Sequence, residues 1–423
     1  MAKGIINSSG FSCHLASALQ LIYHCLPSLR QALIGLSGLR LLESPLLRNF
    51  ARLFAELQRN DDDEPVDPSA LYSALRNQKS VESNDLGDSV RILRTLLATI
   101  RCEMVKLARS STCFKTLIKI LENELDGTME QILTGRKRSV QRCKVKLCAQ
   151  ASPFPVPVAP SLAAGIDKAT IQPQEITGYS WENVEGYDEL EVEDSALEYW
   201  KTSKTIVFQS IPETLLLHLQ RFSLIDGQVQ LLANQMDIPY KLEMNKYCLE
   251  KSLQREYVLK GGLLHVSDSA SEDEEAGHYI AIVRLDGRWI ILDDEDSTEM
   301  SYSEQDILDF LSCRKSSIIQ LNSGRSVCPT LLVYTASQEG GKSSAALLST
   351  FNEQLADKLK KQDKEQNWDF SIIGRRVNIL WAKGNYYPGT IIAYNEIEGK
   401  HKIEYDDGDI KIYNLRNKVI EWI

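Results

Sequence analysis

The hydrophobic pattern changes its period along this chain, and that change limits the folds open to it. From about residue 13 to 126, apolar residues such as Leu15, Leu19 and Ile22 recur every three or four positions, which predicts amphipathic helices. From about 205 to 335, short runs rich in β-branched and aromatic residues lie between turns, which predicts strands. Helices followed by strands are typical of an α+β protein. We therefore predict an α+β fold.

Chain length and composition shifts predict more than one domain. At roughly 150 residues per domain, 423 residues indicate two or three domains, or one large domain with an appendage. We expect a main domain over residues 1–335 and a linker over 336–371, which is rich in Gly and Ser at first and charged afterwards. Residues 372–423 have their own strand-and-turn pattern and are expected to form a separate small domain.

Charge and cysteine content exclude several classes of protein. The chain has 48 basic and 58 acidic residues, a net charge of −10, so we predict no direct nucleic-acid partner. No apolar run reaches the roughly 18 to 20 residues of a membrane span, and we expect no signal peptide and no membrane partner. The nine scattered cysteines predict reduced thiols, as in the cytosol or nucleus.

Cys13 stands where a nucleophile would be activated. It follows the turn-forming run NSSGFS and opens an amphipathic helical pattern. A thiol at a helix N-terminus meets the positive end of the helix dipole and free N–H groups, and both stabilise the thiolate. A buried structural cysteine is the alternative for a residue of this kind.

His278 and Asp293 lie at the ends of two predicted neighbouring strands. His278 opens the run HYIAIVRL, and fifteen residues later RWIILDD ends in Asp293 and Asp294. A hairpin between these runs would bring the imidazole beside a carboxylate, as the base of a cysteine protease requires. The alternative is a strand-end histidine beside a solvated acidic turn.

These segments, in this order, resemble the ubiquitin-specific protease family. The Cys box of that family is similar to the run from Gly4 to Gln20, and its Leu-x-x-His-Leu-x-Arg-Phe strand is similar to Leu215 to Phe222. Its Gly-His-Tyr box is similar to Gly277 to Ala281, followed by Leu-Asp-Asp at 292–294. The resemblance covers about residues 1–335.

The resemblance implies a papain-like fold and a reaction. The implied parts are a helical thumb over about 1–128, β fingers over about 129–205 and a palm over about 206–335. The implied activity is that of a deubiquitinating thiol isopeptidase, which cleaves after the C-terminal Gly of ubiquitin. Ubiquitin and ubiquitinated proteins are then the partners.

The resemblance also implies roles for individual residues. Cys13 would be the nucleophile, His278 the general base and acid, and Asp293 the third member of the triad. Asp294 would be a polar support of the oxyanion region.

The loop before Cys13 departs from the family pattern. It has one residue more than the family spacing, so Ser8 takes the slot of the oxyanion-hole Asn, and Asn7 can serve only if the loop bulges. Phe11 replaces the second Asn of the box. Loss of an oxyanion donor typically costs ~10²–10³ in rate, so a slow enzyme is compatible with this loop.

The cysteines of the predicted fingers do not complete a zinc site. Family members with intact fingers carry two Cys-x-x-Cys pairs, a tetrahedral thiolate set. Here four residues separate Cys143 from Cys148, and the run 198–203, where a second pair is expected, has no cysteine. We therefore predict no metal and no other cofactor.

The C-terminal run 372–423 predicts a small all-β barrel of five short strands. It is rich in aromatic residues, and an aromatic box with a carboxylate binds a methylated ammonium. The run resembles a Tudor domain. Matched to the methyl-ligand cage of Tudor readers, the cage residues are Trp381, Tyr387, Tyr405 and Asp407.

This resemblance implies methyl-lysine or methyl-arginine peptides as partners of the C-terminal domain. The alternative is that the aromatic residues pack the barrel. A tyrosine of a cage should be partly exposed, whereas a tyrosine of the core should not.

Two functions follow for the whole chain. The first is a deubiquitinase recruited to methylated protein or chromatin by the Tudor module, in the nucleus and/or cytoplasm. The second is a catalytically weak or inactive ubiquitin-binding scaffold with a Tudor reader. The intact set of Cys13, His278 and Asp293 favours the enzyme, and a related modifier in place of ubiquitin stays open.

Overall fold

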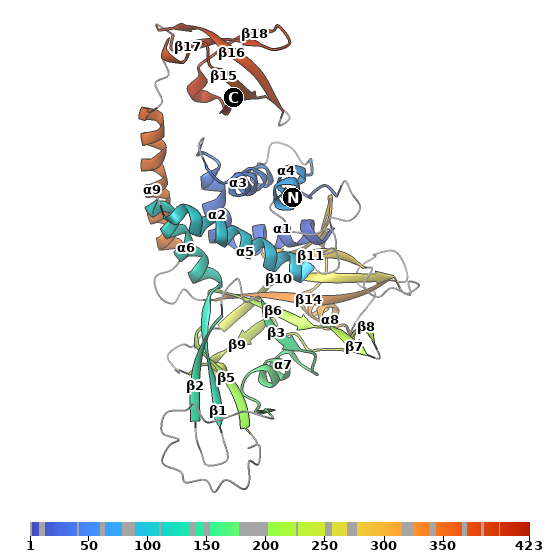
Figure 1. The fold of residues 1–423 in the computed structure, drawn as a ribbon. Helices are drawn as coiled ribbons and strands as arrows, with labels where there is room; N and C mark the ends of the chain where they lie inside the picture. The colour runs from blue at the N-terminus through green and yellow to red at the C-terminus, as the bar shows by residue number, and fades with distance from the viewer. Residues whose placement is uncertain are drawn as a thin grey trace.

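The structure is a computed structural model of the chain. It describes residues 2–7, 13–39, 42–59, 64–77, 89–109, 111–134, 140–147, 153–176, 202–225, 227–249, 256–268, 277–314, 325–337, 344–365, 370–381, 385–396 and 398–423. Figure 1 shows an N-terminal helical part, strands below it, and a C-terminal sheet at the end of a long helix.

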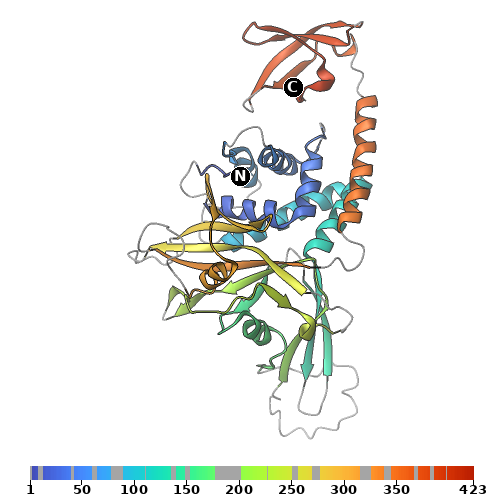
Figure 2. The same cartoon turned by 180° about the vertical axis from the view of Figure 1, so that it is seen from behind.

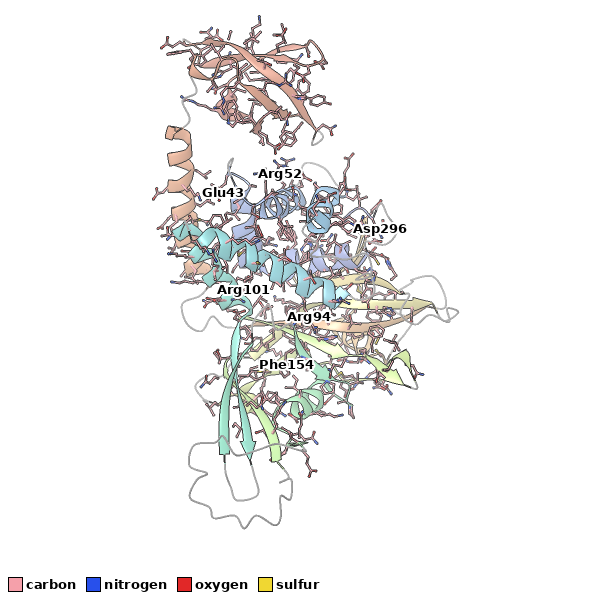
Figure 3. All side chains as sticks on the ribbon, in the orientation of Figure 1. Glu43, Arg52, Arg94, Arg101, Phe154 and Asp296 are labelled. Atoms are coloured by element: carbon pink, nitrogen blue, oxygen red, sulfur yellow. The ribbon has the colours of Figure 1, made fainter. Side chains whose placement is uncertain are left out.

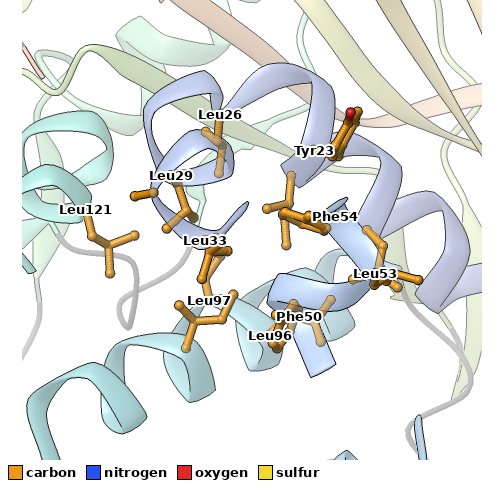
Figure 4. Packing of buried hydrophobic residues seen from close by; sticks show 14 of the residues in the cluster. Tyr23, Leu26, Leu29, Leu33, Phe50, Leu53, Phe54, Leu96, Leu97 and Leu121 are labelled. Atoms are coloured by element: carbon orange, nitrogen blue, oxygen red, sulfur yellow. The ribbon is translucent and has the colours of Figure 1, made fainter. Parts of the chain in front are cut away.

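The N-terminal part is helical, as its apolar periodicity predicts. Its helices are α1 (Cys13–Cys25), α2 (Pro27–Leu36), α3 (Pro45–Gln58), α4 (Ser69–Asn77), α5 (Ser89–Ala108) and α6 (Thr112–Leu125). Leu33 of α2, Phe54 of α3 and Leu97 of α5 are fully buried in one core (Figure 4). Within the described residues, no helix is long and apolar enough to cross a membrane.

Helix α1 is buried on nearly every side. Among its residues only His24 is not buried, because the helix packs against α5 on one side and the central sheet on the other. A helix in this position carries its first residue, Cys13, into the junction between helices and sheet.

The central sheet has the strand order β13-β12-β11-β10-β14-β6-β3, and β9 pairs with β10. All neighbours pair antiparallel except β3 and β6, which are parallel. The strands are β3 (Phe154–Pro157), β6 (Thr214–Gln220), β9 (Lys241–Glu243), β10 (Glu256–Asp268), β11 (His278–Leu285), β12 (Arg288–Asp293), β13 (Asp296–Met300) and β14 (Arg325–Ala336).

Both faces of this sheet are buried, which explains its continuous apolar runs. In β11, Ala281 and Val283 join the core of the helical part. The alternate residues Ile280 and Ile282 join a second core on the opposite face, because side chains alternate along a strand. The helices α7 (Leu162–Ala169) and α8 (Glu304–Leu311) also contribute to that second core.

A four-stranded antiparallel sheet occupies the region predicted as fingers. Its order is β2-β1-β5-β4, and its strands are β1 (Gly127–Thr134), β2 (Val140–Leu147), β4 (Gln174–Ile176) and β5 (Thr202–Ser210). Smaller elements are the hairpin of β7 (Phe222–Ile225) and β8 (Gln228–Leu231) and the 3-10 turn η1 (Asn245–Tyr247).

The Cys143 side chain, residue 148 and most of 198–203 lie outside the described residues, so the zinc prediction stays a prediction.

The C-terminal part contains the five strands predicted from the sequence. They are β15 (Arg376–Leu380), β16 (Tyr386–Asn395), β17 (Lys400–Tyr405), β18 (Ile410–Tyr413) and β19 (Ile420–Trp422), with short 3-10 turns η2 (Phe370–Ile372) and η3 (Leu415–Asn417). The sheet order is β18-β17-β16-β15-β19, an open path in which the two edge strands do not pair with each other. The described residues therefore do not confirm a closed barrel.

Helix α9 (Ser344–Glu365) occupies most of the predicted linker. Its first half is anchored, since Leu348, Phe351 and Leu355 belong to the core of the helical part. It packs against α2 and α6, and from behind it runs beside the helices toward the C-terminal sheet (Figure 2). The segment is thus a structural element of the main domain rather than a free tether.

Candidate active site

Cys13 is the first residue of α1 and is only 4% exposed. Its Sγ is hydrogen-bonded to the side chain of His278 and to the main chain of Tyr279, which are the first two residues of β11. A third partner comes from α1 itself, since Nδ1 of His14 lies 3.5 Å from the sulfur. The sulfur therefore lies within a shell of hydrogen-bonding groups.

His278 and Asp293 are brought together by the β11–β12 hairpin. Nε2 of His278 lies 2.5 Å from Oδ1 of Asp293. The turn between the strands contains Asp286 and Gly287, both with positive φ, which glycine adopts freely and aspartate tolerates. Because Nε2 is bonded to Asp293, Nδ1 is the ring nitrogen of His278 that stays available for Cys13.

The charges of Cys13 and His278 support each other. Burial opposes ionisation of the Cys13 thiol, but hydrogen bonds to His14 and His278 outweigh it and lower the thiol pKa to about 6. Hydrogen bonds to Asp293 and Cys13 raise the pKa of His278 to about 10. At neutral pH the pair is a thiolate beside an imidazolium, the reactive form of a thiol nucleophile.

Asp294 joins the segment before Cys13 to the end of β12. Its Oδ2 accepts a hydrogen bond of 2.8 Å from Nδ2 of Asn7, and its main-chain oxygen accepts one of 2.7 Å from Ile5 N. Asp294 has a positive φ of 50°, and burial raises the pKa of its carboxyl. Gly4 allows this close approach, because a Cβ there would lie 2.0 Å from the main-chain oxygen of Glu295.

Asn7 and Asp294 thus contact each other across 287 positions of sequence. Ser8, the other candidate for the oxyanion site, lies outside the described residues, as does the loop up to residue 12. The oxyanion roles of Asn7 and Ser8 stay predictions. The described contact holds the Asn7 amide beside the turn that carries Asp293.

In the C-terminal sheet, the predicted cage residues differ in exposure. Trp381 and Tyr387 are 37% and 40% exposed, and their ring centroids lie 5.3 Å apart at 50°. Tyr405 is only 4% exposed and belongs to the core of the sheet, where its hydroxyl accepts a 2.9 Å hydrogen bond from Nε1 of Trp381. By the exposure criterion, Tyr387 has the character of a cage residue and Tyr405 that of a core residue.

Charged groups also surround this aromatic surface. Asp407 is exposed, and its Oδ1 accepts a 3.0 Å hydrogen bond from the main chain of Asp409. Nζ of Lys411 lies 6.0 Å from the Trp381 ring centroid and 2.9 Å from the Asp409 carboxylate. A cation of this chain thus already lies near the indole.

The comparison with protein families agrees with the active-site geometry. The family model described as "Ubiquitin carboxyl-terminal hydrolase" matches residues 3–334, a span that includes Cys13, His278 and Asp293. This chain belongs to the ubiquitin carboxyl-terminal hydrolase family. No family match extends over the C-terminal sheet, so the Tudor prediction is not confirmed in this way.

Curated relatives of this chain carry the family name. "Ubiquitin carboxyl-terminal hydrolase 10" of Saccharomyces cerevisiae is 34% identical over 112 residues, which are 26% of this chain and 13% of the relative. "Ubiquitin carboxyl-terminal hydrolase 7" of Drosophila melanogaster is 25% identical over 326 residues, 75% of this chain and 25% of the relative. The chain therefore spans a quarter or less of the length of these hydrolases.

A solved structure shows the same fold. A chain in the structure of the yeast SAGA DUBm with a mutant Sgf73 superposes with a TM-score of 0.55 and 16% sequence identity. The superposition covers 80% of this hydrolase-family chain and 69% of the yeast chain. The predicted fold of a ubiquitin-specific protease is confirmed at the level of a mixed helix-and-sheet architecture.

His14 is a site residue that the motifs did not single out. The motifs give His14 no role, yet its Nδ1 lies 3.5 Å from the sulfur of Cys13. The sequence feature that could have identified His14 as a site residue is its position directly after the cysteine, where the Cys box of the family has Tyr. Sequence alone does not tell which way that side chain turns.

The end of the β11–β12 hairpin also has donors that could hold a cation. Ligand atoms of His278, Asp293 and Asp294 all lie within 4.8 Å of one another. Each already has a hydrogen-bond partner in the site. His278 is bonded to Cys13 and Asp293, and Asp294 is bonded to Asn7. This set suits proton transfer to and from a thiol, which needs no metal.

Proposed function

We propose that this chain is a cysteine-type deubiquitinating hydrolase that cleaves the isopeptide bond after the C-terminal Gly of ubiquitin. The observation that carries the proposal is the hydrogen-bonded set of Cys13, His278 and Asp293, with the thiol pKa lowered to about 6. Membership in the ubiquitin carboxyl-terminal hydrolase family supports the substrate class.

In the proposed reaction the Cys13 thiolate attacks the carbonyl carbon of the terminal Gly. The imidazolium of His278 donates its proton to the departing lysine amine, which leaves a thioester between ubiquitin and Cys13. The neutral His278 then takes a proton from water, and the resulting hydroxide attacks the thioester. Ubiquitin leaves with a free carboxylate, and thiolate and imidazolium are restored.

Asp293 and Asp294 have different proposed roles. Asp293 holds the His278 ring in orientation and stabilises its charged form. Asp294 holds Asn7 near the reacting centre, where its amide or the Ser8 hydroxyl would donate to the oxyanion.

A ubiquitin carrying a thiol-reactive group at its C-terminus tests this proposal. Intact-mass spectrometry should show one adduct on the wild-type chain and none on Cys13→Ala. The matched control is Cys102→Ala, which removes an exposed cysteine on α5 and should leave the adduct unchanged. Turnover of a ubiquitin–lysine isopeptide then measures the rate.

The alternative is a ubiquitin-binding scaffold that lacks efficient catalysis. In that case the folded chain gives no adduct, although a small reagent still alkylates Cys13. Ubiquitin binding without an adduct would select the scaffold and exclude the enzyme.

We further propose that Trp381 and Tyr387 form a binding face for methylated lysine or arginine. Their exposure and their tilted rings support a surface that accepts a cation. Calorimetry with methylated and unmethylated peptides tests it. We expect the methylated peptide to bind, the unmethylated peptide not to bind, and Trp381→Ala to abolish the binding. No binding to the folded chain would exclude a reader.

Localisation to the nucleus and/or cytoplasm stays a prediction, which imaging of a tagged chain would check.

A further inference from the structure

His14 lies in the active site without a role in the proposed proton transfer. The residue is 7% exposed, and its Nδ1 lies 3.5 Å from the Sγ of Cys13. Its ring packs on Tyr279, with centroids 4.9 Å apart at 44°. Its other nitrogen, Nε2, is buried and has no hydrogen-bond partner among the described residues.

The surroundings of the two ring nitrogens select a tautomer of His14. Among main-chain groups, buried N–H groups without a partner are rarer than buried acceptors without one, and we apply the same preference to this ring. The ring avoids an orphaned N–H when its hydrogen is on Nδ1, which then points at the sulfur, and Nε2 keeps a lone pair. In this form His14 is a hydrogen-bond donor to the thiolate.

The two imidazoles at the sulfur therefore differ in what they can do. His278 is bonded through Nε2 to Asp293, which favours its charged form, so it can give a proton to the leaving amine. Nε2 of His14 has no hydrogen-bond partner among the described residues, so none of them is placed to exchange a proton with it. It can only donate one hydrogen bond in a fixed direction.

We propose that His14 is a second catalytic imidazole of this chain, a fixed donor that stabilises the Cys13 thiolate independently of His278. This inference rests on the proposed role of Cys13 as nucleophile and deepens it. The Cys box of the family has Tyr at this position, so an imidazole here departs from the family pattern. A thiolate stabilised twice should persist into mildly acidic solution and should survive, in part, the loss of His278.

Several other groups face Cys13 and must be separated from His14. From β11 come His278 and the main chain of Tyr279, and from the end of β12 come Asp293, through His278, and Asp294. Within α1 and α5 the nearby polar pair is Ser17 and Ser89, which is uncharged. The test therefore substitutes His14 both in the wild-type chain and in a variant that lacks the His278 imidazole.

The experiment measures alkylation of Cys13 by iodoacetamide in the full chain as a function of pH. Mass spectrometry of the Cys13 peptide distinguishes this thiol from the other eight of the nine cysteines. His14→Phe keeps a ring against Tyr279 and removes the donor. His14→Asn removes the ring but keeps an N–H₂ donor attached at Cγ, where Nδ1 of histidine is attached.

The wild-type midpoint of alkylation should lie near pH 6. In His14→Phe we expect it to rise by about one unit, which means about tenfold less thiolate at acidic pH. In His14→Asn it should stay near the wild-type value. The double variant His14→Phe/His278→Ala should have a higher midpoint than His278→Ala, and thermal melting should establish that each variant is folded.

Equal shifts in the Phe and Asn variants would mean that packing, not hydrogen bonding, is responsible, and would overturn the proposal. An unchanged midpoint in His14→Phe would overturn it as well. Because iodoacetamide needs no ubiquitin, this result is independent of the proposed function. A chain with the expected shift but no adduct with the ubiquitin probe would refute only the deubiquitinase.

Discussion

Cys13 and His278 hold the reverse of their usual charge states at neutral pH, and this reversal is the central feature at the scale of single residues. An isolated thiol is mostly neutral at pH 7, and so is an isolated imidazole. Here the two groups and Asp293 are hydrogen-bonded in series, so each charge is stabilised by the next. Of the three groups Cys13 is the buried one, and a buried charge is retained only when it is paired.

The pH dependence of turnover follows from these two groups. The lowered Cys13 pKa, about 6, means that the thiolate is lost as the pH falls through 6. The raised His278 pKa, about 10, means that the acid for the leaving amine is lost as the pH rises through 10. Steady-state cleavage of a ubiquitin substrate should therefore be flat near pH 8 and fall on both sides. A profile that rises only near pH 9 would contradict the proposed ion pair.

Replacing Asp293 by Asn should lower the rate and shift the alkaline limb. The carboxylate is the largest cause of the raised His278 pKa, so its loss should lower that pKa and move the limb toward neutral pH. We expect turnover to fall by about 10²-fold or more, since the ring also loses its orientation. The matched control is Asp286→Asn, in the turn at the other end of the same hairpin, which should keep the wild-type profile.

At the scale of elements, α9 shows how a segment predicted as linker becomes part of the core. Leu348, Phe351 and Leu355 repeat at helical spacing and pack on α2 and α6. Gly35 of α2 allows the close contact, because a Cβ there would lie 3.0 Å from a methyl group of Leu355. The helix therefore contributes to the stability of the thumb.

Truncation of Phe351 tests this role of α9. The side chain is fully buried, so Phe351→Ala should lower the free energy of unfolding by roughly 3 to 5 kcal/mol. The exposed neighbour Asn352 is the control, and its change to Ala should cost less than about 0.5 kcal/mol. Denaturant unfolding measures both. Equal stabilities would mean that α9 is a tether after all.

At the scale of the whole molecule, the C-terminal sheet meets α3 through polar contacts. Arg52 donates a hydrogen bond to the Tyr386 hydroxyl, and its guanidinium lies 5.3 Å from the centroid of that ring. Figure 3 labels Arg52 on α3, between the thumb and the C-terminal sheet. Arg48 and Arg52 also pair with Glu421 at 3.6 and 3.4 Å, and these side chains are about a third exposed. Ion pairs of this kind contribute little and are screened by salt.

Salt and Arg52→Gln should therefore release the C-terminal sheet from α3. Small-angle scattering should show a larger radius of gyration for the variant, and for the wild type in about 1 M salt, where the Debye length is roughly 3 Å. Arg59→Gln changes an exposed arginine just after α3 and serves as control. A radius that responds to neither change would show that the sheet is held by other contacts.

The sequence by itself predicts the local elements and the candidate reacting groups. Helical period and strand alternation are local properties, so the helices to residue 125, the strands β6, β10, β11, β12 and β14 of the central sheet and the five C-terminal strands could be predicted. Cys13, His278 and Asp293 could be named because each lies in a short motif. The order of these motifs, which resembles that of the ubiquitin-specific proteases, carried the prediction of their roles.

Only the tertiary structure decided which distant groups meet. The Asn7–Asp294 contact, the packing of α9, the burial of Tyr405 and the open path of the C-terminal sheet join residues that no local period connects. The direction of the His14 ring belongs with them, although His14 is next to Cys13, because packing against Tyr279 selects its rotamer. Packing depends on the whole chain at once, whereas propensity and spacing act within a few residues.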